Sequence, residues 1–358
     1  MGSTKLRRTR MKITLIYGGK SAEHEVSILS AFSILKAIYY NYYEVQTVYI
    51  TKNGQWLKGP LFKQAPTEEA ELHLTTDNAT EISPSDLKEE NSVIFPVLHG
   101  PNGEDGTVQG LFEVLNMPYV GCGVLASACA MDKIVAKQLF QQAGIPQLPY
   151  VSVIRRKFQD EPEKVFSKCE GTLIYPMFVK PANMGSSVGI SKAENREELS
   201  AAIEEAFRYD RRVIVEQGIE ARELEVAILG NDEIRTTDAG EIVKDVAFYD
   251  YDSKYIDNKV TLQIPADVPS ELHQKMREYA EKAFLAIDGS GLSRCDFFVT
   301  ANEDIFLNEV NTLPGFTPFS MYPLLWENMG INYSDLLEEL IQLAKLRFEK
   351  KQQIELGQ

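Results

Sequence analysis

The chain has 358 residues, of which 44% are hydrophobic, and it carries a formal net charge of −15 at pH 7. A chain of this length divides into two or three domains instead of building one core. The negative charge disfavours nucleic acid and anionic membranes as partners, so any bound phosphate has to be held by a local cluster of positive side chains in a pocket. We therefore expect no nucleic-acid partner and no membrane partner.

The sequence also indicates a reducing compartment. No run of about 18 apolar residues is present, and the N-terminus lacks the apolar stretch of a secretory signal, so we expect a cytoplasmic protein. The cysteines Cys122, Cys129, Cys169 and Cys295 show neither CxxC pairing nor metal-ligand spacing, and we interpret them as reduced thiols. Residues 1–10 are polar and basic, and we interpret them as a leader or an added extension.

Residues 11–121 are predicted to form an α/β domain with an open parallel sheet. A β-rich run at 12–17 ends in Gly18 and Gly19, and apolar residues at helical spacing follow from Ser21. Further β-rich runs at 45–50 and 92–98 bracket polar, irregular sequence. This order of elements is typical of parallel strands joined by crossover connections.

Two further domains are predicted downstream, both with α+β character. The central one, at 122–217, is expected to contain helices at 131–143 and 197–207 and strands at 172–179 and 213–216. The C-terminal one, at 218–358, is expected to contain strands at 224–229, 294–300 and 305–310 and helices at 270–287 and 334–348.

The stretch RCDFFVT-ANED-IFLNEVN predicts a hairpin with its loop at 301–304. If the strands pair symmetrically about that loop, Asp296 faces Glu309 and Arg294 faces Asn311, with all four side chains on one face of the sheet. Opposed carboxylates repel unless a cation lies between them, and these oxygen ligands suit Mg²⁺ bound together with phosphates. The alternative is a solvated polar face.

A second stretch, FVKPANMGSSVGIS, places a glycine-serine loop at 184–189 shortly after a strand that ends at Lys180. Small residues such as Ser186 and Ser187 let backbone N–H groups approach and wrap phosphate oxygens, and such a loop can close as a lid. A flexible linker is the alternative. The loop is not a GxxxxGK[ST] phosphate loop, and the glycine pair at Gly18 is not part of a GxGxxG dinucleotide motif.

Other polar residues have both a functional and an ordinary interpretation. Glu216, Gln217 and Glu223 lie at a strand end where a hinge between domains is expected, and carboxylates there suit ribose hydroxyls, although ordinary surface charges are more common. Glu23, His24 and His99 lie near strand ends, where ligands of open α/β sheets bind. For His24 a structural and a catalytic role both stay open.

Together these stretches resemble the D-alanine:D-alanine ligase family of the ATP-grasp superfamily, from about Met11 to the last helix. The family's motifs occur in its order and spacing: GGKSAEHEVS, LHGPNGEDG, MDK, VKPANMGSSVG, EQGIEARELEVA, FYDYDSKY, SRCDFF and NEVNTLPGFTPFSMYP. The resemblance implies a three-domain ATP-grasp fold in which ATP is clasped between the central and C-terminal domains. It also implies peptidoglycan synthesis from two molecules of D-alanine, and a homodimer.

The resemblance assigns residues to ATP and to the metal, position by position. Asp296, Glu309 and Asn311 match the ligands of two Mg²⁺ ions, for which Mn²⁺ can substitute. The residues that match nucleotide contacts are Lys133, Lys180, Ser187, Glu216, Gln217, Ile219, Glu223 and Lys254.

On the substrate side, the resemblance places Glu23 on the ammonium of the first D-alanine, in a network with Ser186 and Tyr255. Arg294 and the N–H of Gly315 match the groups around the reacting carbonyl. The remaining substrate contacts that it implies are His99, Ser320 and Met321.

The loop at 184–189 and the segment at 250–258 are expected to be lids that keep water from a D-alanyl phosphate intermediate. Tyr255 favours an amine nucleophile, because relatives that make an alanine–lactate ester lack this tyrosine. The alternatives are another ATP-grasp carboxylate–amine ligase, including the D-lactate type, and an ATP-binding regulatory module without turnover. A dinucleotide-binding reductase is excluded because the first turn lacks GxGxxG.

Overall fold

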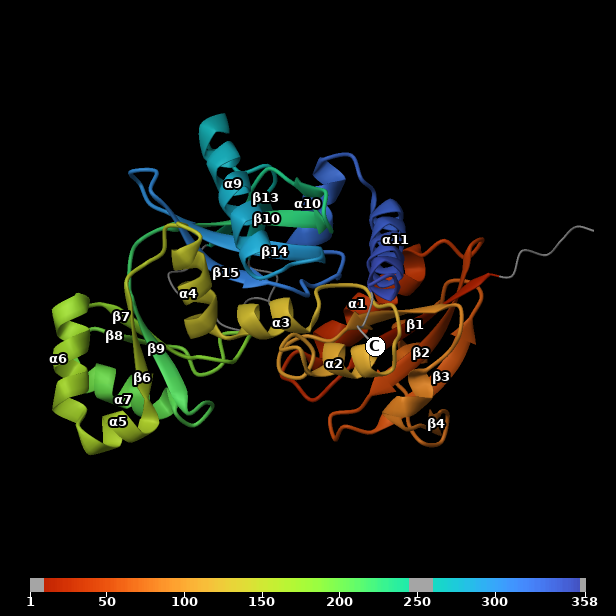
Figure 1. Ribbon diagram of the computed structural model, residues 1–358, viewed down its shortest axis with the longest axis horizontal. Helices are drawn as coiled ribbons and strands as arrows, with labels where there is room; N and C mark the ends of the chain where they lie inside the picture. Colours follow the sequence, from red (N-terminus) through yellow and green to blue (C-terminus); the bar gives the residue numbers. More distant parts are fainter. Residues whose placement is uncertain (1–9, 245–259, 355–358) are drawn as a thin grey trace, which may run out of the picture.

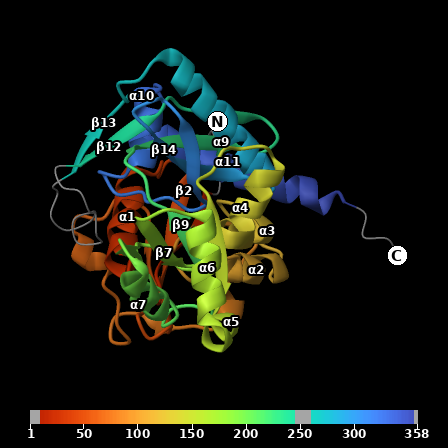
Figure 2. The same ribbon diagram turned by 90° about the vertical axis from the view of Figure 1, so that its left-hand side faces the viewer.

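The computed structural model describes residues 10–244 and 260–354, and its strands form three sheets that are grouped in chain order (Figure 1). The first sheet lies at the lower right of Figure 1, the second at the lower left and the third at the top. Figure 2 views the molecule from the side of the second sheet and shows the third sheet and α9 above it. No helix in these residues has the length and apolar character needed to span a membrane.

The first sheet has the strand order β4-β3-β2-β1-β5. Three of its five strands, β1, β2 and β5, are parallel, as predicted. β3 and β4 add antiparallel pairs at one edge, in sequence that we interpreted as irregular. Its elements are β1 (Met11–Gly18), α1 (His24–Ala37), β2 (Tyr43–Ile50), β3 (Trp56–Phe62), η1 (Glu69–Leu72), β4 (Thr80–Glu81), η2 (Pro84–Leu87), β5 (Ser92–Val97) and α2 (Thr107–Val114).

The second sheet is antiparallel, with the order β6-β9-β7-β8, and α5, α6 and α7 cover it. The predicted strand at 172–179 is wrong in its first half, because α6 continues to Thr172 and the strand starts only after Pro176. The elements are β6 (Tyr150–Ile154), α5 (Arg155–Asp160), α6 (Pro162–Thr172), β7 (Met177–Pro181), β8 (Ser191–Ala193), α7 (Arg196–Ala206) and β9 (Arg212–Gln217).

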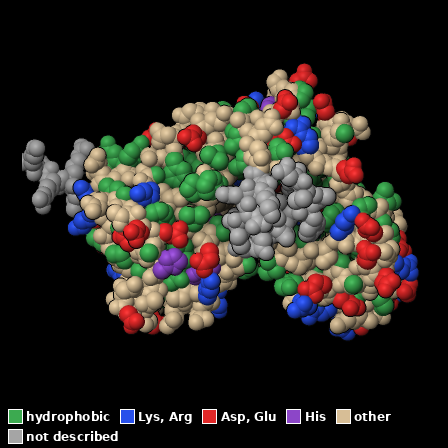
Figure 3. Space-filling view, turned by 180° about the vertical axis from the view of Figure 1, so that it is seen from behind, with side chains coloured by type: hydrophobic (Ala, Val, Ile, Leu, Met, Phe, Trp, Pro, Cys, Tyr) green, Lys and Arg blue, Asp and Glu red, His purple; other side chains and the backbone are tan. Residues whose placement is uncertain are grey.

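Acidic and basic side chains are intermixed on the surface of the second-sheet lobe, on the right in Figure 3. Many of them form ion pairs there. Arg196 pairs with Glu163 and Glu170, and Arg208 pairs with Glu205. Such exposed pairs contribute little to stability, so the lobe depends on its apolar core, in which Phe158, Phe166 and Phe207 pack together.

The third sheet is antiparallel, with the order β13-β12-β10-β14-β15, and β11 pairs with residues 228–230 of β10, on the edge that β12 occupies at residues 223–225. Two helices before the second sheet, α3 (Val124–Met131) and α4 (Lys133–Gln142), contact this third sheet or its helix α9. The other elements are β10 (Arg222–Gly230), β11 (Ile234–Thr236), β12 (Gly240–Lys244), β13 (Val260–Gln263), α9 (Ser270–Ala286), β14 (Gly291–Val299), β15 (Ile305–Asn311), α10 (Met321–Asn328) and α11 (Tyr333–Gln352).

The two faces of the third sheet belong to different cores. Leu224, Val226 and Ile228 of β10 pack in the core under α9, whereas Ala227 and Leu229 pack in a core that is continuous with the first sheet, α1 and α11. The first and third sheets are therefore joined by a shared core, and the second sheet has a core of its own. The proposed domain limits at 121 and 217 stay a prediction.

Candidate active site

The hairpin of β14 and β15 places the predicted metal ligands as the symmetric pairing requires. Arg294 is the register partner of Asn311, and Asp296 is the partner of Glu309. Nearer the loop the register differs by one residue, because Phe297 pairs with Leu307, and a bulge lies between these pairs. The bulge turns Glu309 and Asn311 away from the core that contains Leu307 and Val310, so both polar residues reach the other face.

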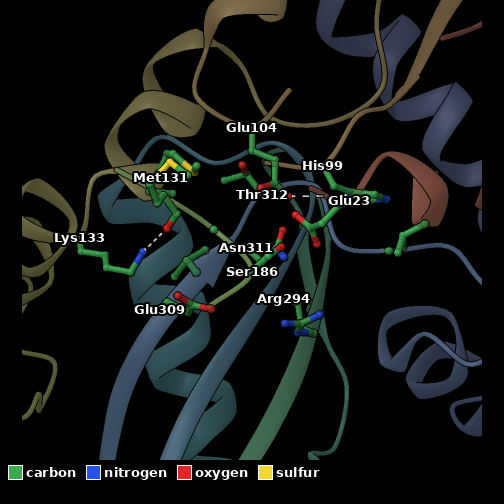
Figure 4. Close-up of a pocket in the computed structure, with 16 residues that line it drawn as sticks. Glu23, His99, Glu104, Met131, Lys133, Ser186, Arg294, Glu309, Asn311 and Thr312 are labelled. Carbon is green, nitrogen blue, oxygen red and sulfur yellow. Dashed lines mark hydrogen bonds and ion pairs between the residues drawn. The ribbon is translucent and has the colours of Figure 1, made fainter. Parts of the chain in front are cut away.

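That face of the hairpin closes a small inner cavity of about 80 Å³. Figure 4 shows Lys133 and Glu309 at one end of it, Glu23 and His99 at the other, and Ser186 and Asn311 between them. The cavity thus draws its walls from all three sheet regions. The lining side chains with polar groups are Glu23, His99, Glu104, Lys133, Ser186, Arg294, Glu309, Asn311 and Thr312.

The first-sheet region contributes an acidic wall with one neutral imidazole. Glu23, directly before α1, is 8% exposed, and burial raises the pKa of Glu104 well above its usual range. His99 is buried, which lowers the pKa of its imidazole. Its Nδ1 lies 3.2 Å from the carbonyl oxygen of Leu313, which assigns the proton to Nδ1, and its Nε2 has no partner in the part of the chain that the structure describes. His99 therefore keeps, beside the cavity, a buried hydrogen-bond acceptor without a partner among the described residues.

His24, in contrast, has a structural environment. It is buried, its Nδ1 lies 2.6 Å from the carbonyl oxygen of Gly19, and its Nε2 lies 2.8 Å from the hydroxyl of Tyr49. Because both ring nitrogens are hydrogen-bonded within the first-sheet region, this histidine supports the turn after β1.

The glycine-serine loop lies over the inner cavity. The Lys133 ammonium donates to the carbonyl oxygen of Met184 at 2.5 Å, and a methyl group added to Gly185 would lie 3.9 Å from Glu23 Oε2. Ser186 and Ser187 both have left-handed backbones, with φ of 54° and 59°, which is costly for residues with a Cβ. The buried hydroxyl of Ser186 has no partner among the described residues, so the strained loop places an unsatisfied hydroxyl beside the cavity.

A larger outer cavity of about 730 Å³ lies between the second and third sheets. It shares the lining residues Lys133, Ser186 and Glu309 with the inner cavity, so the two cavities adjoin. Predicted nucleotide contacts that line it, besides the shared ones, are Lys180, Ser187, Glu216, Gln217, Ile219 and Glu223, and Asp296 lines it as well.

A buried ion triad forms one wall of the outer cavity. The Glu216 carboxylate accepts from the Lys137 ammonium at 2.8 Å and from the Lys180 ammonium at 2.6 Å. Burial alone would raise the pKa of Glu216, but the two lysines outweigh it and lower this pKa. Burial opposes the charge of Lys180 too, yet Glu216 raises its pKa, whereas burial lowers the pKa of Lys133. With two lysines and one glutamate, the triad has one net positive charge, which attracts an anionic ligand.

The side chain of Gln217 fixes the C-terminal end of β9. Its amide nitrogen donates to the carbonyl oxygen of Ile174 at 2.9 Å, and its amide oxygen accepts from the Ile174 N–H at 2.9 Å. This side chain therefore ties β9 to the segment before β7, and the backbone from Gln217 to Ile219 borders the cavity. Glu223, from β10, faces the same cavity.

Arg294 is held by two carboxylates. Its Nε and Nη2 donate to the Asp296 oxygens at 2.7 Å each, and its Nε also lies 3.0 Å from Glu225 Oε2. Glu225 was not among the predicted site residues. It lies two residues after Glu223 in β10, and the alternation of side chains along a strand was a signal that would have found it.

Two further residues were missed. Lys137 lies one helical turn after Lys133 on α4, a spacing that places both lysines on the same side of that helix. Glu104 belongs to LHGPNGEDG and accepts from the Gly100 N–H at 2.9 Å. Both are ordinary surface residue types in the sequence, and only the packing of distant elements buries them.

The predicted substrate contacts of the last region are only partly brought together. Gly315 lines the inner cavity, and a methyl group added to it would come within 2.8 Å of Ser320 Oγ, so Ser320 lies directly behind it. Met321 starts α10 and its side chain is buried in the core shared with the first sheet, outside the lining of either cavity. Lys254, Tyr255 and the segment 250–258 lie outside the described residues.

The residues proposed for Mg²⁺ fit it by donor type and by register, since Asp296 and Glu309 are opposed carboxylates and Asn311 adds an amide oxygen on the same face. Among residues 10–244 and 260–354, no group of three His, Cys, Asp or Glu side chains is arranged to hold a metal. Both oxygens of Asp296 accept from Arg294. A cation at this face therefore has to compete with that guanidinium.

Comparison with known proteins shows what this chain is similar to. Residues 12–122 match the family described as D-ala D-ala ligase N-terminus, and residues 139–342 match D-ala D-ala ligase C-terminus. The chain is 64% identical to the D-alanine–D-alanine ligase of Enterococcus hirae, over 96% of this chain and 98% of that protein. It is 65% identical to the ligase of the same name from Enterococcus faecalis, over 95% of this chain and 100% of that protein.

Solved structures agree in fold. The VanG D-Ala:D-Ser ligase of Enterococcus faecalis is 36% identical with a TM-score of 0.83, over 94% of this chain and 100% of that one. The D-alanine–D-alanine ligase of Coxiella burnetii is 33% identical with a TM-score of 0.82, over 96% of each chain. The predicted three-part ATP-grasp fold class is thereby confirmed, and the chain belongs to the D-alanine–D-alanine ligase family.

Proposed function

We propose that this protein uses ATP to join two molecules of D-alanine into D-alanyl-D-alanine for peptidoglycan synthesis, through a D-alanyl phosphate. The observation that carries the proposal is that the two cavities adjoin and share Lys133, Ser186 and Glu309 as lining residues. The inner cavity is small and polar, and the outer one has the size of a nucleotide pocket and a wall of buried lysines. A carboxylate held in the first therefore meets a terminal phosphate held in the second, at Lys133 and Ser186.

For the first half-reaction, Glu23 binds the ammonium of one D-alanine and leaves its carboxylate directed at the γ-phosphate of ATP. Lys133 and Lys180 balance the charge of the phosphates, with Ser187, Gln217, Ile219 and Glu223 along the rest of the nucleotide. The carboxylate oxygen bonds to the γ-phosphorus as the bond to ADP breaks. The loop at 184–189 acts as a lid that keeps water from the acyl phosphate.

For the second half-reaction, the amine of the other D-alanine attacks the acyl carbon and phosphate leaves. Arg294 and the Gly315 N–H stabilise the oxyanion, a contribution of about 3–4 kcal/mol for one such donor. His99, which lines the inner cavity and whose Nε2 has no partner among the described residues, lies beside the incoming amine. The second carboxylate binds at Ser320 and at the backbone of Met321, where the N–H groups of the first turn of α10 favour an anion.

We propose Asp296, Glu309 and Asn311 as ligands of two Mg²⁺ ions, which Mn²⁺ can replace. When bound, the metal neutralises phosphate charge. Because Glu309 lines both cavities, Glu309→Gln is expected to lower Mg²⁺-dependent turnover by about 100-fold and to weaken Mn²⁺ binding, measured by electron paramagnetic resonance with ADP present. Full activity at ordinary Mg²⁺ concentrations would contradict the metal assignment.

The second substrate needs its own test, because one structural relative is a D-Ala:D-Ser ligase. The protein is supplied with ATP, Mg²⁺ and D-alanine together with D-serine or D-lactate, and the products are identified by mass. We expect D-alanyl-D-alanine to dominate. A mixed product in excess would keep the reaction class and replace the second substrate.

We further propose a cytoplasmic homodimer. The described thiols are free, and burial raises the pKa of Cys122 and of Cys169 to about 11 each, which suits structural thiols in a reducing compartment. Light scattering coupled to gel filtration is expected to give twice the mass of one chain.

A further inference from the structure

Three carboxylates lie in one row across the third sheet. Glu225 of β10 is the register partner of Asp296 of β14, which is in turn the partner of Glu309 of β15. Directly opposed like charges destabilise a sheet, and Glu225 is only 4% exposed, so water does not screen its charge. Such a row is expected only where cations are supplied to it.

Arg294 supplies a cation to this row. The Arg294 guanidinium, 8% exposed, makes two parallel hydrogen bonds of 2.7 Å to Asp296 and lies 3.0 Å from Glu225 through its Nε. One guanidinium edge is therefore shared between two carboxylates from neighbouring strands. Figure 4 shows this guanidinium below Ser186 and Asn311 in the inner cavity.

The proposed reaction, on which this inference rests, makes two demands on the same atoms. Asp296 has to offer its oxygens to Mg²⁺, while Arg294 has to stay in place to stabilise the oxyanion. In the described structure the Asp296 oxygens accept from Arg294. If Asp296 turns to the metal, Arg294 needs another carboxylate, because a buried guanidinium without one is strongly unfavourable.

We propose that Glu225 is a positioning residue that holds Arg294 when Asp296 binds the metal. Its Oε2 already lies within ion-pair distance of Nε, so the guanidinium changes partner without leaving the cavity. Glu225 acts through Arg294 and touches no substrate. Its charge lowers the cost of releasing Asp296 and so strengthens metal binding.

The test is Glu225→Gln, which keeps the size of the side chain and removes its charge. Mn²⁺ affinity is measured by electron paramagnetic resonance with ADP and without turnover. We expect the affinity to fall about 10- to 100-fold, as for other outer-sphere partners, and kcat to fall similarly with little change in the KM for ATP. Glu225→Asp retains the charge and is expected to recover part of both losses.

Glu241→Gln is the matched control. Glu241 is also buried at 9% exposure and pairs with an arginine, Arg222, through bonds of 2.6 and 2.7 Å. It is the register partner of Leu224, so its side chain lies on the opposite face of the same sheet. Loss of this buried pair is expected to lower stability and to leave Mn²⁺ affinity unchanged.

A double-mutant cycle separates positioning from simple charge attraction. In an Arg294→Met background the guanidinium no longer competes for Asp296, so adding Glu225→Gln is expected to leave Mn²⁺ affinity unchanged. An equal loss in both backgrounds, or an unchanged affinity in the single variant, would overturn the proposal. If Glu225→Gln does not fold, Mn²⁺ affinity is measured in Glu225→Asp instead, and wild-type affinity in that variant would overturn the proposal. The Mn²⁺ titration needs no turnover. Failure of the proposed ligase reaction is therefore detected separately, by analysis of the products.

Discussion

At the residue scale, Glu216 is a buried charge that fixes the position of a lysine. Its carboxylate is 4% exposed and bonded to both Lys137 and Lys180, so it stays ionised and fixes a lysine at the wall of the outer cavity. Replacement by Gln leaves two buried ammonium groups without their counter-ion. Removing one partner of a buried ion pair costs about 3–5 kcal/mol.

The stability difference between wild type and Glu216→Gln is predicted to depend on pH. The folded-state pKa of Glu216 is lowered, so its contribution is complete above the ordinary carboxyl pKa of 4.5 and is lost as the pH falls towards the folded-state value. We expect the difference, measured by urea unfolding, to be largest near pH 7 and to shrink below about pH 4.5. A difference that grows on acidification would contradict this.

Ser186 lines the inner cavity and combines a left-handed backbone with a buried hydroxyl. Ser186→Ala is predicted to lower kcat by about 10- to 100-fold, because the lid then no longer completes the network with Glu23. Ser293→Ala is the control, since Ser293 also has a buried hydroxyl without a partner among the described residues but pairs with Ile228 of the core. Unchanged steady-state kinetics in Ser186→Ala would remove the lid role.

At the scale of elements, the N-terminus of α4 positions Lys133, a proposed nucleotide contact. The Asp132 side chain accepts from the N–H groups of Ile134 and Val135, at 3.2 and 3.0 Å, and pairs with Arg212 of β9. This cap starts the helix at Lys133 and ties it to the second sheet. The predicted helix start at 131 was wrong by two residues because the capping aspartate was not recognised.

Asp132→Ala is predicted to destabilise the protein by about 1–2 kcal/mol, the usual cost of a lost N-cap, and to raise the KM for ATP because Lys133 loses its fixed position. Asp132→Asn retains a capping oxygen and loses the charge paired with Arg212. Thermal melts and ATP titrations of both variants separate the two effects. A wild-type KM for ATP in Asp132→Ala would show that the cap does not position Lys133.

The hairpin of β14 and β15 shows what can be predicted from a sequence and why. Symmetric pairing about the loop predicted both functional pairs, because opposed polar residues in two apolar strands fix which side chains share a face. The bulge was not predicted. The spacing between apolar residues is nevertheless longer from Leu307 to Val310 than from Ile305 to Leu307, which indicates a bulge. Strand pairing within a hairpin is local, but symmetric pairing holds only beyond the bulge, and the pairs next to the loop differ from it by one residue.

At the scale of the whole molecule, the site depends on contacts that no local rule contains. The inner cavity joins residues as far apart as Glu23, Ser186 and Asn311, and the core of the third sheet also includes Ala126 and Phe140 from helices that precede the second sheet. Lys137, Glu104 and Glu225 were missed because their burial arises only from this assembly. Motif resemblance supplied the other residues, since a family pattern records tertiary contacts that spacing alone does not.

The most direct test of the central claim is phosphate release from ATP and Mg²⁺ in the presence of D-alanine, L-alanine or neither, with the product identified by mass. The account predicts release that requires D-alanine, with one phosphate formed for each molecule of D-alanyl-D-alanine. Release that needs a different acid and amine, or D-alanine-independent ATP hydrolysis without a dipeptide, would contradict it.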